Sequence, residues 1–177
     1  LTVEDVVFTF ERIITEGGMG GETSPRQGLL GPLESVEAID ETSVKFTFES
    51  PWPIFLKMLP HQQIIPKAYL EEVGDDEFRN HPIGSGPFKF VEGSLDERIV
   101  LERFDDYHGG APNIEYLVFD VIPELSSRVS ALQAGEVQRI VAVTPVVAEE
   151  LMGDDSIDVK YVNSTRAYML EMNVEME

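Results

Sequence analysis

The stretch His81-Pro82-Ile83-Gly84-Ser85-Gly86-Pro87 is the densest cluster of turn residues in this chain of 177 residues. Proline and glycine interrupt regular structure, because proline lacks a backbone donor and glycine reaches conformations closed to other residues. Helices and a hairpin are predicted before this stretch, and repeated strands after it. We therefore predict two subdomains, over residues 1–82 and 83–177. We also expect Gly84 or Gly86 to adopt a positive φ angle.

An amphipathic helix opens the segment before the turn. Apolar residues at positions 3, 6, 7, 10, 13 and 14 lie on one helical face, and Thr2 and Asp5 suit its N-terminus. A long glycine-rich loop then runs to Pro32. Residues 33–39 and 44–48 predict a β-hairpin, because apolar and polar residues alternate along the second of them. We expect a short helix ending at Leu59 and a second short helix after Pro66.

The segment after the turn predicts strands interleaved with helices. The expected helices cover residues 126–134, ending at Gly135, and 145–152. The expected strands cover residues 88–92, 98–103, 115–122, 137–143, 157–162 and 167–173. This order is typical of an α/β or mixed α+β fold with mixed sheets. Residues 46–48 and 118–121 should belong to different sheets.

The charge of the chain is strongly negative. It has 33 Asp and Glu against 13 Lys and Arg, a formal net charge of −20 at pH 7. Nucleic-acid binding needs a basic surface, so we expect no nucleic-acid partner. The acidic surface has two interpretations. It either keeps the protein soluble, or it adapts the protein to high salt, where the Debye length falls to about 3 Å at 1 M.

Few residues suggest chemistry. The chain has no Cys, which excludes disulfides and thiolate metal sites, and its three His residues form no metal-binding motif. Gly84-Ser85-Gly86 matches neither the G-x-S-x-G nucleophile motif nor a phosphate-binding loop. We therefore expect no catalytic residue, metal or cofactor. A hydrolase using His61 with a carboxylate, and an interaction module, remain alternatives from other classes.

Four segments, in order along the chain, resemble one family. Leu1-Thr2-Val3-Glu4-Asp5-Val6-Val7-Phe8 is similar to L-T-A-E-D-V-V-F, and residues 82–90 to P-V-G-T-G-P-Y/F-K-F. Residues 107–112 resemble Y-W-G-G-K-P, although His108 replaces Trp. Residues 131–138 resemble A-L-Q-x-G-E-V-D, although Gln138 replaces Asp. Together they resemble family 5 of the solute-binding proteins of ABC importers for peptides and nickel.

The resemblance implies a fold, a function and a location. Residues 1–82 would form the peripheral subdomain of lobe I in a periplasmic-binding-protein-like fold, and residues 83–177 part of the core subdomain, ending near the hinge. The chain would be an internal piece of an importer's substrate-binding component, which captures oligopeptides, dipeptides or a related solute for membrane permease subunits. A nickel or metallophore receptor is the alternative. The protein would be extracytoplasmic, at the periplasm or cell surface, with a lipid anchor in the full-length protein.

Ligand-binding residues follow from the family's motif order, which places the loop 17–31 and residues 61–64 near the cleft between two lobes. We therefore predict that Arg26, Gln27, His61, Gln62 and Gln63 bind ligand. The alternatives are an Arg26 that anchors its loop, and an exposed and a capping role for the last two residues. In nickel-type members an Arg near position 62 pairs with an acidic chelator. Gln62 has no such charge, which favours a peptide or neutral solute.

Overall fold

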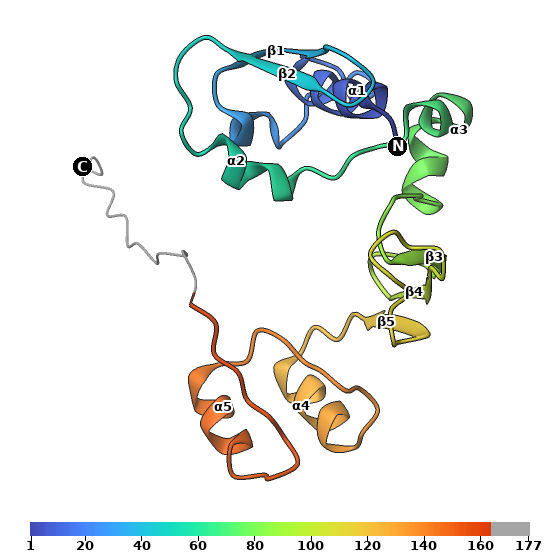
Figure 1. The fold of residues 1–177 in the computed structure, drawn as a ribbon. Coiled ribbons are helices and arrows are strands. Elements are labelled where there is room, and N and C mark those ends of the chain that lie inside the picture. Colours follow the sequence, from blue (N-terminus) through green and yellow to red (C-terminus); the bar gives the residue numbers. More distant parts are fainter. Residues whose placement is uncertain (164–177) are drawn as a thin grey trace, which may run out of the picture. The chain divides into compact units, whose positions relative to one another are not determined.

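The computed structural model describes residues 1–163 (Figure 1). The chain forms two compact units, the first covering Leu1–Val121 and the second beginning at Ile122. This division follows the last strand of the first unit and differs from the predicted subdomain boundary at Pro82. The assignment of residues 1–82 and 83–177 to subdomains of one lobe stays a prediction.

The first helix confirms the sequence prediction. Helix α1 covers Val3–Ile14, with Thr2 as its N-cap residue. The Thr2 backbone N–H donates to Asp5 Oδ2 over 2.7 Å, so the carboxylate satisfies a backbone donor that has no partner within the helix. The buried residues Thr9, Phe10 and Ile13 form the face of the helix that enters the core.

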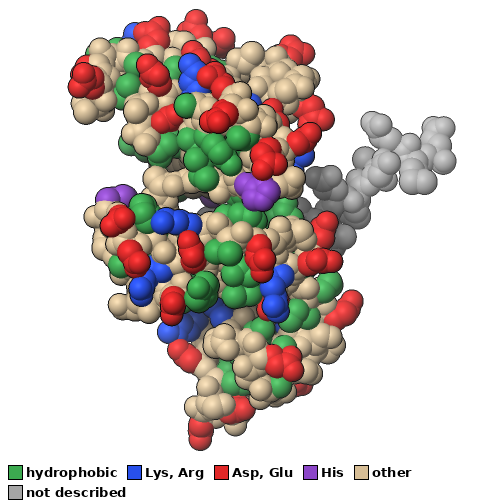
Figure 2. Space-filling model, turned by 90° about the vertical axis from the view of Figure 1, so that its right-hand side faces the viewer, with side chains coloured by type: hydrophobic (Ala, Val, Ile, Leu, Met, Phe, Trp, Pro, Cys, Tyr) green, Lys and Arg blue, Asp and Glu red, His purple; other side chains and the backbone are tan. Residues whose placement is uncertain are grey.

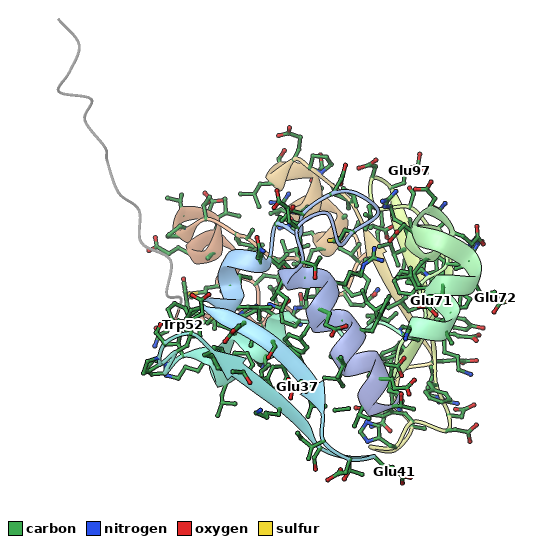
Figure 3. The ribbon with its side chains drawn as sticks, turned by 90° about the horizontal axis from the view of Figure 1, so that it is seen from above. Glu37, Glu41, Trp52, Glu71, Glu72 and Glu97 are labelled. Carbon is green, nitrogen blue, oxygen red and sulfur yellow. The ribbon has the colours of Figure 1, made fainter. Side chains whose placement is uncertain are left out.

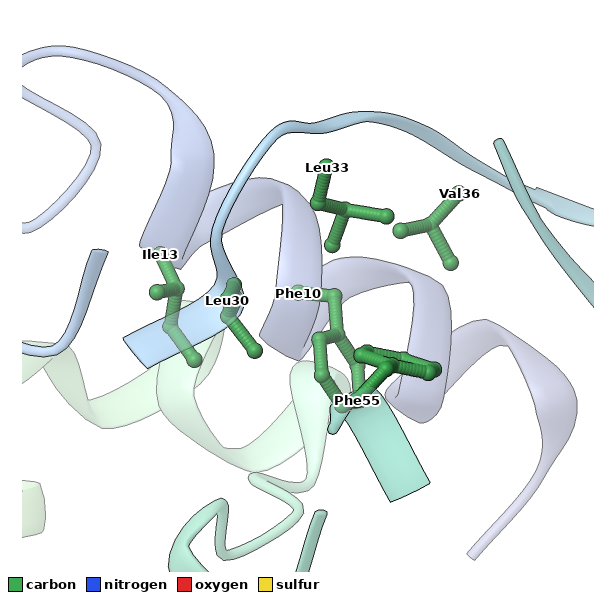
Figure 4. Close-up of a cluster of buried hydrophobic side chains, with 6 residues drawn as sticks. All are labelled: Phe10, Ile13, Leu30, Leu33, Val36 and Phe55. Carbon is green, nitrogen blue, oxygen red and sulfur yellow. The ribbon is translucent and has the colours of Figure 1, made fainter. Parts of the chain in front are cut away.

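The predicted hairpin is also confirmed, and it carries the core of the first unit. Strands β1 (Leu33–Ala38) and β2 (Val44–Phe48) are antiparallel, with Val36 opposite Phe46. Helix α1 packs on β1. The phenyl rings of Phe10 and Phe46 meet edge to face with centroids 4.9 Å apart. The buried cluster between helix and hairpin is shown in Figure 4 and consists of Phe10, Ile13, Leu30, Leu33, Val36 and Phe55.

Short helices connect the hairpin to the next part of the chain. They are α2 (Phe55–Met58), the 3₁₀ turn η2 (Leu59–His61) and α3 (Lys67–Asn80), while a further 3₁₀ turn, η1 (Gln27–Leu30), lies in the glycine-rich loop. The α3 segment begins directly after Pro66, as expected, and spans 14 residues. Gly74 breaks it, with a φ angle of +81°, so the segment consists of two short helical pieces.

A second sheet follows the Pro82 turn. Strands β3 (Phe88–Gly93), β4 (Arg98–Arg103) and β5 (Tyr116–Asp120) form an antiparallel sheet in the order β3-β4-β5. The prediction of two separate sheets is confirmed. Because both are antiparallel, the mixed sheets expected from the sequence are not found in the part of the chain that the structure describes.

The second unit contains helices α4 (Leu125–Gln133) and α5 (Pro145–Leu151), both predicted. Gly135 ends α4 with a φ angle of +75°, as expected of a residue after a helix C-terminus. The predictions of strands at 137–143 and 157–162 are wrong. Neither segment pairs with a strand among the described residues, and Ala142, at a φ angle of +57°, interrupts the first. The strand predicted at 167–173 lies outside the described residues.

The prediction for the turn glycines is also wrong. Neither Gly84 nor Gly86 adopts a φ angle in the left-handed region. Gly86 precedes Pro87, and the proline ring restricts the preceding residue to extended conformations. The turn therefore contains no left-handed glycine.

Acidic side chains are common on the exposed surface. On the face drawn in Figure 2, Asp and Glu are scattered over the molecule and outnumber Lys and Arg. In Figure 3, Glu71 and Glu72 point outward from α3, and Glu37 lies on the hairpin. Glu37 and Lys45 form a cross-strand ion pair with 3.6 Å between Oε2 and Nζ, and both side chains are more than half exposed. Such exposed pairs contribute little to stability.

Candidate functional site

Three of the five predicted site residues meet at one place in the first unit. Arg26 Nη1 donates one hydrogen bond to the His61 carbonyl oxygen and another to Gln63 Oε1, each over 2.5 Å. The glycine-rich loop is thereby joined to the segment that follows η2. This contact supports the interpretation of Arg26 as a residue that anchors its loop, and it leaves the rest of the guanidinium group available.

Gln62, the residue between His61 and Gln63, is buried. Its backbone N–H donates to Leu59 O over 2.9 Å and so caps η2, which was one of the two roles considered. Its side chain is only 7% exposed, and neither Nε2 nor Oε1 has a hydrogen-bond partner among the described residues. An unpaired buried amide is costly, so each such group calls for an explanation.

The side chains of Gln27 and His61, the two remaining predicted residues, do not take part in the Arg26 contact. Gln27 Nε2 donates to Ile14 O over 2.7 Å, which ties the glycine-rich loop to the C-terminus of α1. The side chain of His61 is exposed, and only its backbone oxygen takes part in the Arg26 contact. Neither residue lines the cavity described next. Whether they bind ligand stays a prediction.

A cavity of about 860 Å³ lies beside Gln62 within the first unit. Its wall is formed by α1, residues 62–65, the end of α3, the turn at 82–86 and the hairpin of β3 and β4. Arg26, Gln62 and Gln63 contribute to the lining. Cavities that hold small ligands range from about 300 to 1,000 Å³, so this one is large enough for a short peptide.

Hydrogen bonds to α1 hold residues 62–67 in place. Ile65 N donates to Thr9 Oγ1 over 2.9 Å, and the Thr9 hydroxyl donates to Asp5 O over 2.7 Å. Lys67 N donates to Asp5 Oδ1 over 2.8 Å. Partial burial alone would raise the pKa of Asp5, but hydrogen bonds from Thr2 and Lys67 outweigh it and lower the pKa.

Sequence reasoning missed Thr9 and the turn residues as parts of the site. Thr9 is 1% exposed and lines the cavity, and its only sequence signal is a hydroxyl on an otherwise apolar helix face. Gly84, Ser85 and Gly86 line the cavity too. A Cβ atom added at either glycine would have no heavy atom within 4 Å.

Trp52 does not belong to the cavity. It is partly buried against the core cluster, which agrees with packing rather than ligand stacking. Its indole lies so close to Gly31 that a Cβ there would come within 2.4 Å of Trp52 Cε2.

Residues 1–163 do not contain two other kinds of feature. No group of three or more His, Asp or Glu in this range could hold a metal ion. No helix in the same range is long and apolar enough to cross a membrane.

Solved structures with this fold are proteins that bind solutes. DppA from Helicobacter pylori, in complex with the peptide STSA, matches with a TM-score of 0.75 and 28% identity, over 87% of this chain and 33% of its own. NikZ from Campylobacter jejuni, in complex with Ni(L-His), matches with a TM-score of 0.68 and 25% identity, over 77% of this chain and 27% of its own. These similarities confirm the mixed α and β fold class expected from the sequence.

All 177 residues match the family of bacterial extracellular solute-binding proteins, family 5, and the chain belongs to that family. The dipeptide-binding protein of Escherichia coli is 30% identical over 188 aligned residues, covering 99% of this chain and 35% of that protein. The chain thus spans about a third of this relative's length. Members of the family are binding proteins and not enzymes.

Proposed function

We propose that the protein containing this chain is the substrate-binding component of an ABC importer that captures dipeptides, oligopeptides or a related solute. The observation that carries this proposal is the unpaired, buried amide of Gln62 beside a ligand-sized cavity, in a chain that belongs to a solute-binding family. The side chain presents an N–H donor group and a carbonyl acceptor next to each other, which can pair with the C=O and N–H groups of a peptide.

The remaining parts of the site suit binding without catalysis. Arg26 and Gln63 sit at the rim of the cavity and hold each other by a hydrogen bond, so their positions are set before a ligand arrives. We propose that this chain catalyses no reaction, which agrees with the binding proteins it resembles. Its partners would be the solute and the permease subunits in the membrane, and its location extracytoplasmic, with a lipid anchor.

A second candidate is a receptor for a metal complex. It is favoured by one observation, the similarity to NikZ in complex with Ni(L-His). The two candidates differ in what the protein should retain during purification, either a peptide or a metal complex.

Native mass spectrometry of the full-length protein tests the proposal, because tight receptors keep their ligand. We expect an added mass that matches a peptide. An added mass of nickel with a small chelator would support the second candidate instead.

Calorimetry with the retained compound then tests the site. Gln62→Ala should weaken binding about tenfold, from the loss of two hydrogen bonds. Gln138→Ala is the matched control, since this exposed side chain lies in the second unit. Equal affinity of both variants and the wild type would contradict the role of Gln62.

A further inference from the structure

Residues 163–165 are Asn-Ser-Thr, which is the acceptor motif for N-glycosylation, Asn-x-Ser/Thr with any x except Pro. The sequence has four Asn residues, and the other three lack a hydroxyl side chain two positions further on. The residues at those positions are Pro82, Glu115 and Glu175. The chain therefore has a single candidate acceptor, Asn163, which is the last residue that the structure describes.

Asn163 lies in a segment that suits an acceptor. Helix α5 ends at Leu151, and residues 157–163 form neither helix nor strand (Figure 1). A glycosyl transferase must take the asparagine side chain into its own active site, which an exposed and irregular segment permits and a packed helix or strand hinders. Ser164 and Thr165 lie outside the described residues and belong to the motif by sequence alone.

The segment before the motif has room for a bulky group. Between residues 152 and 163 no side chain is buried, and Asn163 itself is exposed. The contacts of this segment are local: Ser156 N donates to Asp154 Oδ1 over 2.9 Å, and Lys160 Nζ lies 2.9 Å from Asp158 Oδ2. A glycan on Asn163 would therefore displace no packed core.

The two residues before Asn163 expose apolar surface that a glycan would cover. Tyr161 is 66% exposed, and Val162 is 88% exposed. Side chains two positions apart in an extended chain point to the same side, so we expect the Tyr161 ring to lie beside a group attached to Asn163. The face of an aromatic ring is apolar and electron-rich, and the C–H groups of a sugar ring pack on it. Tyr161 thus offers the first sugar a surface, which is an observation independent of the motif.

We propose that Asn163 is an N-glycosylation site and that Tyr161 packs against the first sugar of the glycan. This inference goes beyond solute binding and rests on the extracytoplasmic location in the proposed function, because N-glycosylation acceptors are found in exported chains.

The glycan donor would be a glycan joined to a lipid phosphate. The bond between the sugar C1 atom and the phosphate oxygen breaks, and the lipid phosphate leaves with the bonding electron pair. Asn163 Nδ2 forms the new bond to C1 and loses one proton, which the released phosphate or water takes up.

Peptide mapping by mass spectrometry tests the proposal on the full-length protein purified from the organism that encodes it. Trypsin cleaves after Lys160 and Arg166, so it isolates the motif in the peptide of residues 161–166. We expect this peptide to carry the added mass of one or more sugars, and Asn163→Gln to remove that mass. Unmodified peptide from the wild-type protein would overturn the proposal.

Variants of the hydroxyl position separate the motif from an effect on folding. Thr165→Ser keeps the hydroxyl group and should keep the glycan, whereas Thr165→Ala should lose it. Glu115→Thr is the matched positive control, because it gives the exposed Asn113 the same motif. A glycan on Asn113 in this variant, with none on Asn163, would show that the host modifies the motif but does not use this site.

Nitration by tetranitromethane tests the packing of Tyr161. The ring should react several times more slowly in the glycosylated protein than in Asn163→Gln. Equal rates would overturn the contact between Tyr161 and the sugar.

Labelling of intact cells with a membrane-impermeant amine reagent separates this inference from the proposed function. Labelled protein that carries a glycan supports both. Labelled protein without a glycan supports the extracytoplasmic location and overturns the glycosylation site. Protein that is neither labelled nor glycosylated counts against both.

Discussion

The two sheets of the first unit have similar strand patterns but different burial. Apolar and polar residues alternate in β2 and at the start of β3, where Lys89 lies between Phe88 and Phe90, and both sheets are antiparallel. The β1–β2 hairpin is covered by α1 and shares a buried core with it. None of the residues of β3, β4 or β5 is buried, and Phe119 of β5 is 52% exposed.

Alternation of apolar and polar residues therefore specifies a strand, but it does not specify a buried core. Burial requires a covering element, and among the described residues only the first sheet has one. The uncovered sheet instead offers apolar side chains of β3 and β4 to the cavity. The sheet that carries less of the core is therefore the one that contributes to the candidate site.

Removal of an aromatic ring should show the largest difference in stability between the two sheets. Phe10→Ala should lower the free energy of unfolding by about 3–5 kcal/mol, because the ring is 2% exposed and leaves a cavity. Phe119→Ala on β5 should change it by less than about 1 kcal/mol. Urea denaturation of both variants measures this. Similar losses would mean that the second sheet carries as much of the core as the first.

A glycine near the first sheet should tolerate substitution worse than one at the cavity. Gly31→Ala should destabilise by about 1–3 kcal/mol, because its φ angle is +60° and the new methyl group would overlap the Trp52 ring. Gly84→Ala is the control, since its methyl group would enter open space. Thermal denaturation compares them, and an unchanged melting temperature for Gly31→Ala would show that Trp52 moves aside freely.

The carboxylate that anchors α1 should make the stability of the first unit depend on pH. The folded pKa of Asp5 lies below its unfolded value, so its contribution is present above pH 3.8 and lost as the pH falls through the lowered pKa. Asp5→Asn should cost about 1 kcal/mol at pH 7. The difference from wild type should shrink in acid. Asp106→Asn, an exposed control, should show neither effect. A cost that persists at pH 2 would argue against a charge effect.

The smallest effect should come from salt, which acts on the whole acidic surface. The net charge of −20 produces self-repulsion that salt screens. We expect the melting temperature to rise by a few degrees between about 0.1 M and 1 M NaCl, since the Debye length falls from about 10 to 3 Å. A melting series in NaCl measures it. A flat series would leave solubility as the explanation of the acidity.

The local elements could be predicted because their causes are local. Thr2 and Asp5 mark the start of α1, and the alternation after residue 44 marks a strand. The short helix after Pro66 was predicted, but its break at Gly74 and the second helical piece were not. The shape of the Pro82 turn was misjudged, because Pro87 restricts Gly86 to extended conformations. The segments 137–143 and 157–162 have strand-like composition, but a strand forms only with a neighbour to pair with.

The local sequence patterns were enough to predict α1, the β1–β2 hairpin, the resemblance to the family and the residues to consider for the site. The sequence also determined the acidic surface, because charge is a sum over residues and needs no geometry. The packing of the elements, in contrast, brings Arg26 to the segment that carries Gln62 and Gln63, and brings the Gln27 side chain to the C-terminus of α1. It also decided that the wall of the cavity contains no acidic residue. These are contacts between residues far apart in the chain, and such contacts depend on how the elements pack.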